Sequence, residues 1–131
     1  MADARIGPHD SAGAPLPQLL CDVNALAAVD PVPAGALWRL AESGRQLDAN
    51  LVRIRPDERI DTHTEPDLDV LLLVIAGDGT LGTTNDPQPL TVGSLAWLPH
   101  GSTRSLTAGK DGICYLTVHR RRPGMRINGI S

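Results

Sequence analysis

The sequence predicts a single all-β domain built as a barrel or a sandwich. From residue 36 onward, short apolar segments alternate with Gly, Pro, Asn and Asp at intervals of about eight to twelve residues, as in antiparallel strands joined by tight turns. A chain of 131 residues is long enough to bury one hydrophobic core and short enough to need no second domain. Helical periodicity is confined to the region before the strands.

Nine strands are expected, and their number and shortness favour a jelly roll. They are predicted at residues 36–40, 46–55, 60–64, 69–76, 79–84, 88–91, 94–98, 103–108 and 113–119. Gly77-Asp78-Gly79 is expected to form a hairpin turn, because these residues tolerate the positive φ angles that a tight hairpin requires. Residues 85–87 and 99–101 combine Pro with Asn or Gly and predict further turns.

The segment Val70-Leu71-Leu72-Leu73-Val74-Ile75 is apolar at every position. A strand with one face in water alternates between apolar and polar residues, whereas this one needs cover on both faces. A second sheet, the N-terminal segment or another subunit must provide the outer cover.

The chain before the strands divides into an arm and a short helix. Residues 1–17 are rich in Ala, Gly and Pro without apolar periodicity, which predicts a flexible arm, and the domain is placed at 18–131. Leu19–Val29 carries apolar residues at helical spacing and is expected to end before Pro31, because a residue preceding Pro avoids the helical region.

Composition argues against nucleic-acid and membrane partners. The chain has 12 Lys and Arg against 15 Asp and Glu, and only three aromatic residues, so it offers no base-stacking platform. Its longest apolar run, 70–76, has the length of a strand and not of a membrane span. The basic run 119–122 is interpreted as a solvated strand exit.

A cytoplasmic protein with reduced cysteines is expected. The first residues lack the charged start followed by an apolar block that marks a secretory signal. Cys21 and Cys114 lie far apart without CxxC spacing, and Cys114 falls within a predicted strand. Both are expected to be structural thiols.

Two motifs resemble those of the cupins, in particular the small single-domain bacterial ones. Gly93 to Arg104 follows the second cupin motif, Gly, five residues, Pro-x-Gly, two residues and His, at every position except the last. His63-Thr64-Glu65, followed by Val70 and Gly77, is similar to part of the first motif, His-x-His, Glu and Gly. The resemblance covers residues 36 to 119 and implies a cupin-type double-stranded β-helix, a jelly-roll barrel.

The resemblance also implies a degenerate metal site. Metal-binding cupins use two His and a Glu from the first motif and a His from the second. Position by position, His63 is retained, while Glu65, Val70 and Arg104 replace the second His, the Glu and the final His. A guanidinium has no lone pair to give and would repel a cation, so no metal cofactor is favoured.

The metal alternative remains open with other donors. An Fe, Mn, Zn or Ni ion would need a third ligand besides His63 and Glu65, which Asp69, Asp67 or His119 could supply. Asp69 reaches the usual Glu position only through a one-residue register shift, and such a shift turns a side chain to the opposite face of a strand.

A charge swap is the preferred interpretation. Glu65 and Arg104, both placed inside the barrel by the motif, are expected to pair with each other, because each would be costly to bury alone. The pair is either purely structural, or Arg104 keeps one edge free for a ligand carboxylate or phosphate beside His63. Tyr115, Thr117 and His119 share one face of the last strand and would line the same pocket if that face points inward. His119 would otherwise be half-exposed at the strand end.

Three functions follow. The first choice is a homodimeric barrel that binds a small anionic molecule through His63, Glu65, Arg104, Tyr115 and His119. The second is a metal-dependent enzyme of the dioxygenase or isomerase type, and the third is an interaction module with a filled barrel. Catalytic residues are unknown and no reaction is named, because fold does not determine function.

Overall fold

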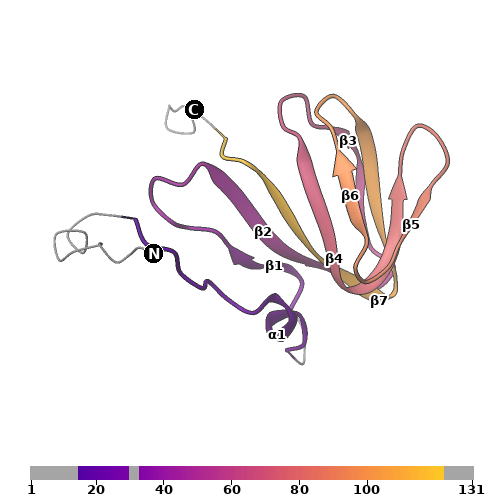
Figure 1. The fold of residues 1–131 in the computed structure, drawn as a ribbon. Helices are drawn as coiled ribbons and strands as arrows, with labels where there is room; N and C mark the ends of the chain where they lie inside the picture. The colour runs from indigo at the N-terminus through magenta and orange to yellow at the C-terminus, as the bar shows by residue number, and fades with distance from the viewer. Residues whose placement is uncertain (1–14, 30–32, 123–131) are drawn as a thin grey trace.

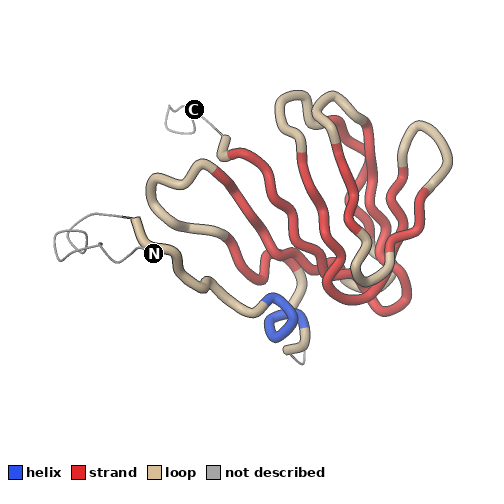
Figure 2. Tube along the Cα trace, viewed as in Figure 1, coloured by secondary structure: helices blue, strands red, loops and turns tan. Residues whose placement is uncertain are grey.

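The computed structural model describes residues 15–29 and 33–122, and within these ranges its regular structure is antiparallel β structure apart from one short helix (Figure 2). The elements in chain order are α1 (Val23–Ala27), β1 (Gly35–Arg39), β2 (Leu47–Ile54), β3 (Arg59–Thr64), β4 (Val70–Gly82), β5 (Gln88–Leu90), β6 (Leu95–Leu98) and β7 (Thr103–Arg120). The expected all-β class is confirmed. The described residues contain seven strands and not nine, because two predicted pairs of strands are each continuous.

The predicted hairpin at Gly77-Asp78-Gly79 is wrong. β4 continues through these residues and pairs with β7 on both sides of them. The register of this pairing shifts twice, between Val74 and Ala76 and between Gly77 and Gly79. Such bulges bend a strand without reversing it. β7 bends at the same level, where Gly112, like Gly77, adopts a positive φ. The residues that predicted a turn therefore make a corner shared by two long strands.

This corner folds one sheet into two halves (Figure 1). In the first half, the beginning of β4 and the end of β7 pair with each other, β7 also pairs with β2, and β4 with β6, which gives the order β1-β2-β7-β4-β6. In the second half, the end of β4 and the beginning of β7 continue their pairing, with β5 and β3 on their outer sides. The long strands thus belong to both halves, as in a jelly roll.

The main core lies between the two halves. Its members come from both of them and are buried: Ile54, Leu68, Val70, Leu72, Val74, Leu81, Leu90, Leu98, Leu106, Ala108, Ile113 and Tyr115. Alternate residues of each strand supply this inner face, which accounts for the period of two seen in the sequence.

A second, smaller cluster covers part of the outer face of the first half. Ala27 of α1 packs there with Leu51 and Cys114, beside Ile75 of β4. The helix is shorter than predicted and begins later, because Asp22 caps its start: its Oδ1 accepts hydrogen bonds from the amides of Asn24 (3.0 Å) and Ala25 (3.1 Å). The N-terminal region therefore covers one end of the apolar strand, as one of the three options anticipated, but it leaves Leu71 42% exposed.

Other expectations concern the chain ends, the cysteines and the membrane. Most of the predicted arm, 1–17, lies outside the described residues, and residues 15–17 are exposed and in no helix or strand. Cys21 and Cys114 are both free, and Cys114 is buried in β7 as expected. No helix in the described part of the chain is long and apolar enough to cross a membrane.

We predict that Gly77→Ala destabilises the fold far more than Gly44→Ala. The two glycines share a φ of 75°, but a Cβ at Gly77 would overlap the carbonyl group of Gly112, whereas a Cβ at Gly44 would meet nothing within 4 Å. The shared positive φ lowers the free energy of unfolding by about 1–2 kcal/mol in each variant. Any further decrease in Gly77→Ala therefore reports the clash between the new Cβ and the Gly112 carbonyl group. Equal losses in free energy of unfolding, measured by urea denaturation, would contradict this account of the corner.

Candidate functional site

A cavity of about 200 Å³ opens between the two halves of the sheet. Its apolar wall consists of Ile60, Val70, Leu72, Leu81, Leu98 and Leu106, and its remaining lining residues are His63, Glu65, Arg104, Ser105, Tyr115, Thr117, His119 and Arg122. Exposed residues such as His63 and Arg122 belong to the mouth, while Tyr115 is buried. The cavity is thus an apolar pocket with a group of polar and charged side chains.

The five residues expected to form a pocket all line this one cavity. His63 on β3 lies directly opposite Arg104 on β7 in the antiparallel register. Tyr115, Thr117 and His119 alternate along β7, so the face they share points inward. The structure therefore brings together residues that are more than fifty positions apart in the sequence.

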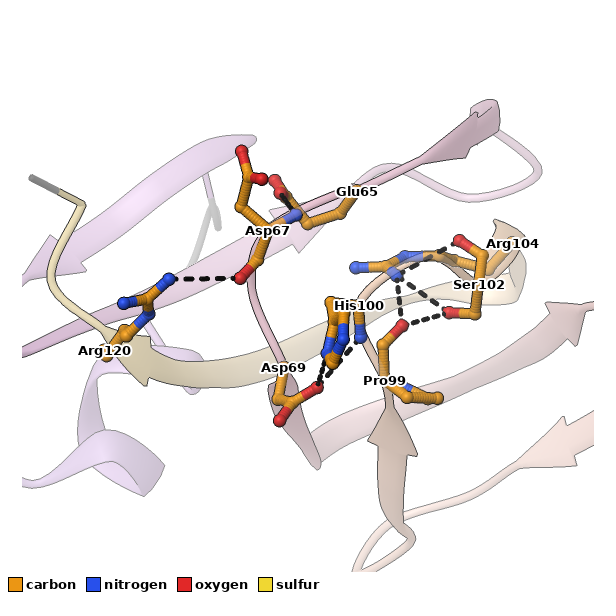
Figure 3. Close-up of polar contacts among 8 residues, drawn as sticks. All are labelled: Glu65, Asp67, Asp69, Pro99, His100, Ser102, Arg104 and Arg120. Carbon is orange, nitrogen blue, oxygen red and sulfur yellow. Dashed lines mark hydrogen bonds and ion pairs between the residues drawn. The ribbon is translucent and has the colours of Figure 1, made fainter.

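Arg104 is a buried cation without a carboxylate partner among the described residues. Arg104 is only 7% exposed. Its Nη1 donates a hydrogen bond to Ser102 Oγ at 3.0 Å and makes longer contacts with the carbonyl oxygens of Ser102 (3.4 Å) and Pro99 (3.5 Å) (Figure 3). Burial lowers the pKa of Arg104, and the negative charge of Glu65 partly opposes that shift. Because a guanidinium stays protonated in proteins, the positive charge remains in the cavity wall.

The predicted Glu65–Arg104 pair is wrong. Glu65 instead binds Arg122, whose Nη2 donates to Oε1 at 2.5 Å, and its Oε2 accepts the Asp67 amide at 2.8 Å. The hydrogen bonds from Arg122 and Asp67 lower the pKa of Glu65 to about 2. Both oxygens of the Glu65 carboxylate accept hydrogen bonds from these other groups. Glu65 therefore acts on Arg104 only through the long-range attraction between their charges.

The interpretation of residues 119–122 as a solvated strand exit is also wrong in part. The end of β7 lies beside the loop that follows β3, so the chain leaving the barrel passes Glu65. His119 and Arg122 line the cavity, and Arg120 Nη2 donates to the Asp67 carbonyl at 3.3 Å. Arg122 and Ser102 were missed as site residues, because a run of charges and a turn serine carry no local signal of what they contact.

Tyr115 places a hydroxyl group in the buried part of the cavity. The residue is 4% exposed, burial raises its pKa to about 12, and its hydroxyl makes no hydrogen bond with the described residues. A buried hydroxyl normally finds a partner, because leaving it unpaired costs free energy. The phenol therefore remains neutral and available as a donor.

The two histidines of the cavity have one ring nitrogen occupied. His63 Nδ1 lies 2.9 Å from the carbonyl oxygen of Asp61, and His119 Nδ1 lies 2.7 Å from that of Arg120. A carbonyl oxygen only accepts, so each Nδ1 carries a proton. In the neutral rings, Nε2 remains as an acceptor, and it becomes a donor when the ring is protonated.

Asp69 and Asp67 lie outside this cavity. Asp69 Oδ1 accepts from His100 Nδ1 (2.7 Å) and from the His100 amide (2.9 Å), and both hydrogen bonds lower the pKa of Asp69 (Figure 3). Together with Asp67 and Arg120, this pair lines a separate surface hollow. The register shift that would have turned Asp69 into the barrel does not occur.

Solved structures resemble this chain at the level of the fold. BH2720 from Bacillus halodurans superposes with a TM-score of 0.67 at 17% identity, over 85% of this chain and 87% of that one. A Klebsiella pneumoniae protein with a double-stranded β-helix domain gives 0.62 at 16% identity, over 79% and 90%. A cupin-2 domain protein from Shewanella frigidimarina gives 0.55 at 18% identity, over 64% and 78%.

The chain has the cupin fold. No protein-family profile matches its sequence, and no curated protein matches it either. The likeness at this low identity extends to the double-stranded β-helix and carries no substrate or reaction with it.

The side chains at the cupin ligand positions do not fit a divalent cation. His63 and Glu65 line the cavity, but Val70 belongs to its apolar wall and Arg104 stands opposite His63. Among the described residues, no three His, Cys, Asp or Glu side chains gather closely enough to hold a metal ion. A cation bound by His63 would also face the unpaired guanidinium of Arg104.

We predict that Glu65→Gln lowers the free energy of unfolding by about 1 kcal/mol at pH 7, because it removes a charged partner of Arg122. The folded state depresses the pKa of Glu65 from 4.5 to about 2, so the stabilisation is fully present above pH 4.5 and is lost as the pH falls toward 2. Urea denaturation from pH 7 to pH 2 should therefore show the two proteins converging.

Glu58→Gln is the matched control, since the exposed Glu58 side chain accepts no hydrogen bond from the described residues. If the difference in free energy of unfolding between the wild type and Glu65→Gln is independent of pH, the Glu65–Arg122 ion pair is not the cause of that difference.

Proposed function

We propose that this protein binds a small anionic molecule, a carboxylate with an apolar body, in the cavity between the halves of its sheet. Arg104 would hold the carboxylate, and the leucine-rich wall would hold the body. The observation that carries the proposal is the buried guanidinium of Arg104, which faces the cavity without a carboxylate partner among the described residues.

The charges of the cavity support an anion over a cation. Arg104 and Arg122 contribute two positive charges and Glu65 one negative charge, which leaves a net charge of +1 with both histidines neutral. The Glu65 carboxylate is already bound to Arg122. The Arg104 fork, of which Nη1 alone donates to described residues, retains donors suited to a carboxylate.

Neighbouring polar groups complete the proposed site. The unpaired hydroxyl of Tyr115 would donate to the ligand, and His63, opposite Arg104, would provide a further hydrogen bond. A bound acceptor would relieve the cost of the buried, unpaired hydroxyl.

The volume of the cavity limits the size of the ligand. Pockets for drug-sized molecules measure about 300–1,000 Å³, so a cavity of about 200 Å³ suits a smaller molecule. This open volume favours ligand binding over the third alternative, an interaction module whose barrel is filled by its own side chains. The proposal is therefore one of binding or sensing and assigns no reaction.

We expect small apolar carboxylates such as hexanoate and benzoate to raise the melting temperature of the wild-type protein, and Arg104→Gln to abolish the effect. A ligand present at ten times its Kd stabilises the folded state by about 1.4 kcal/mol, which differential scanning fluorimetry detects as a shift of a few degrees. Inorganic phosphate serves as the comparison anion without an apolar body.

Arg55→Gln is the control for charge, because Arg55 is exposed and does not line the cavity. Carboxylates that fail to stabilise the wild type, or that stabilise Arg104→Gln equally, would contradict the proposal.

Tyr115→Phe should separate binding from stability. Because the hydroxyl has no partner among the described residues, its removal should leave the unliganded protein as stable as the wild type or more stable, by up to about 1 kcal/mol. The same variant should lose part of the stabilisation by carboxylates, measured in parallel by scanning fluorimetry. A marked loss of stability without ligand would show that the hydroxyl has a structural role instead.

A further inference from the structure

The turn between β6 and β7 supplies every hydrogen-bond acceptor that holds Arg104 among the described residues. We name residues 99–102 the β6–β7 turn. The carbonyl oxygens of Pro99 and Ser102 accept from Arg104 Nη1 at 3.5 and 3.4 Å, and the Ser102 hydroxyl oxygen accepts from it at 3.0 Å. The place of the guanidinium in the cavity wall therefore depends on the conformation of this turn.

The β6–β7 turn has the geometry of a type II β-turn. The amide of Ser102 donates to the Pro99 carbonyl at 3.1 Å, and Gly101 has a φ of 81°, as the third residue of such a turn requires. The Ser102 hydroxyl donates to the same Pro99 carbonyl at 2.6 Å. These bonds fix the oxygens of the turn relative to one another, while contacts outside the turn set its orientation toward the neighbouring segment.

Residues 65–69, the segment between β3 and β4, anchor the turn from outside the cavity. Asp69 Oδ1 accepts both the amide of His100, at 2.9 Å, and the ring Nδ1 of His100, at 2.7 Å (Figure 3). The carbonyl oxygen of Glu65 accepts the amide of Gly101 at 2.7 Å. Both central residues of the turn are therefore held by hydrogen bonds to this segment.

The pair of Asp69 and His100 is too exposed to act mainly as a stabilising ion pair. Its side chains are 46% and 63% exposed, and ion pairs in contact with water contribute little to stability. Neither residue lines the cavity, so neither is placed to touch a ligand bound there. An effect of this pair on the cavity has to act through the β6–β7 turn.

We propose that Asp69 and His100 are positioning residues for the anion site, because they hold the β6–β7 turn so that Arg104 presents its remaining donors to the cavity. The inference rests on the proposed function, in which Arg104 binds a carboxylate. Nη1 is the one nitrogen of Arg104 that donates to described residues, so the turn determines which way the other donors point. A binding group that is already oriented loses less conformational freedom when the ligand arrives.

Loosening the turn should weaken binding without removing any contact to the ligand. If Arg104 keeps the binding orientation for about one tenth of the time, the apparent Kd of a carboxylate rises about tenfold. The unliganded protein should remain folded, since the pair that is removed is exposed. A selective loss of affinity therefore distinguishes positioning from a general contribution to stability.

Conservative and non-conservative variants of the pair provide the test. Asp69→Ala removes both hydrogen bonds to His100, whereas Asp69→Asn keeps a carbonyl oxygen that can accept them. The Kd of hexanoate, measured by isothermal titration calorimetry, should rise about tenfold in Asp69→Ala and stay within about threefold of the wild type in Asp69→Asn. His100→Asn keeps a side-chain N–H donor near the place of Nδ1 and should bind hexanoate more tightly than His100→Ala.

A second readout follows Arg104 itself and needs no ligand. The nitrogen–proton signal of Arg104 Nε in a heteronuclear NMR spectrum is assigned by its absence from Arg104→Gln. Asp69→Ala should shift this signal, and Asp69→Asn should shift it less.

Asp22→Ala is the matched control for Asp69→Ala. The Oδ1 atom of Asp22 also accepts two hydrogen bonds, from the amides of Asn24 and Ala25, but it does so at α1 and outside the cavity lining. This variant should leave both the Arg104 signal and the Kd of hexanoate unchanged.

The two readouts separate the positioning role from the proposed function. A wild type that binds no carboxylate contradicts the proposed function, and the Arg104 signal then decides the positioning role alone. An Arg104 signal that is unchanged in Asp69→Ala overturns the positioning role whether or not hexanoate binds. The role is also overturned if hexanoate binds Asp69→Ala as tightly as the wild type, or if Asp22→Ala weakens binding to the same extent.

Discussion

The close approach of the β4 and β7 backbones at Gly77 and Gly112 is the constraint on which the rest of the structure depends. Without side chains at this contact, two long strands bend together and carry one antiparallel sheet around a corner. The bend opposes the two halves of the sheet, and their inner faces bury the core. It also brings β3 and both parts of β7 around one space, so that the cavity is a direct consequence of the corner.

The chemistry of that cavity is set by how its charges are partnered. Glu65 is bound by Arg122, a residue of the segment leaving the barrel, and by the Asp67 amide, which leaves Arg104 as a buried cation held only by neutral oxygens. In the position where a metal-binding cupin would present a His, this chain presents a guanidinium. Our proposal follows from this: the guanidinium of Arg104 gives the cavity wall a positive charge, and Val70 extends the apolar wall where a metal-binding cupin would present a carboxylate.

Much of the fold and part of the site could be predicted from the sequence, and the failures have physical causes. Strands follow from alternation, and the resemblance to the two cupin motifs implied that His63 and Arg104 lie close together in the barrel. The hairpin predicted at Gly77-Asp78-Gly79 was wrong because a hairpin turn and a β-bulge can both require a residue with positive φ. Only the pairing with a partner strand distinguishes the two. The pairing of Glu65 with Arg122 was not foreseeable, since it depends on where the chain leaves the barrel relative to the loop after β3, a tertiary feature without a local signal.

The most direct test of the central claim is a crystal structure of the full chain grown in bromide, with anomalous diffraction recorded at the bromine edge and at those of Mn, Fe, Ni and Zn. The account predicts bromide within hydrogen-bonding distance of the Arg104 guanidinium, inside the cavity and in contact with the Tyr115 hydroxyl. A transition metal bound at His63, or bromide confined to the outer surface while the cavity stays free of anions, would contradict it.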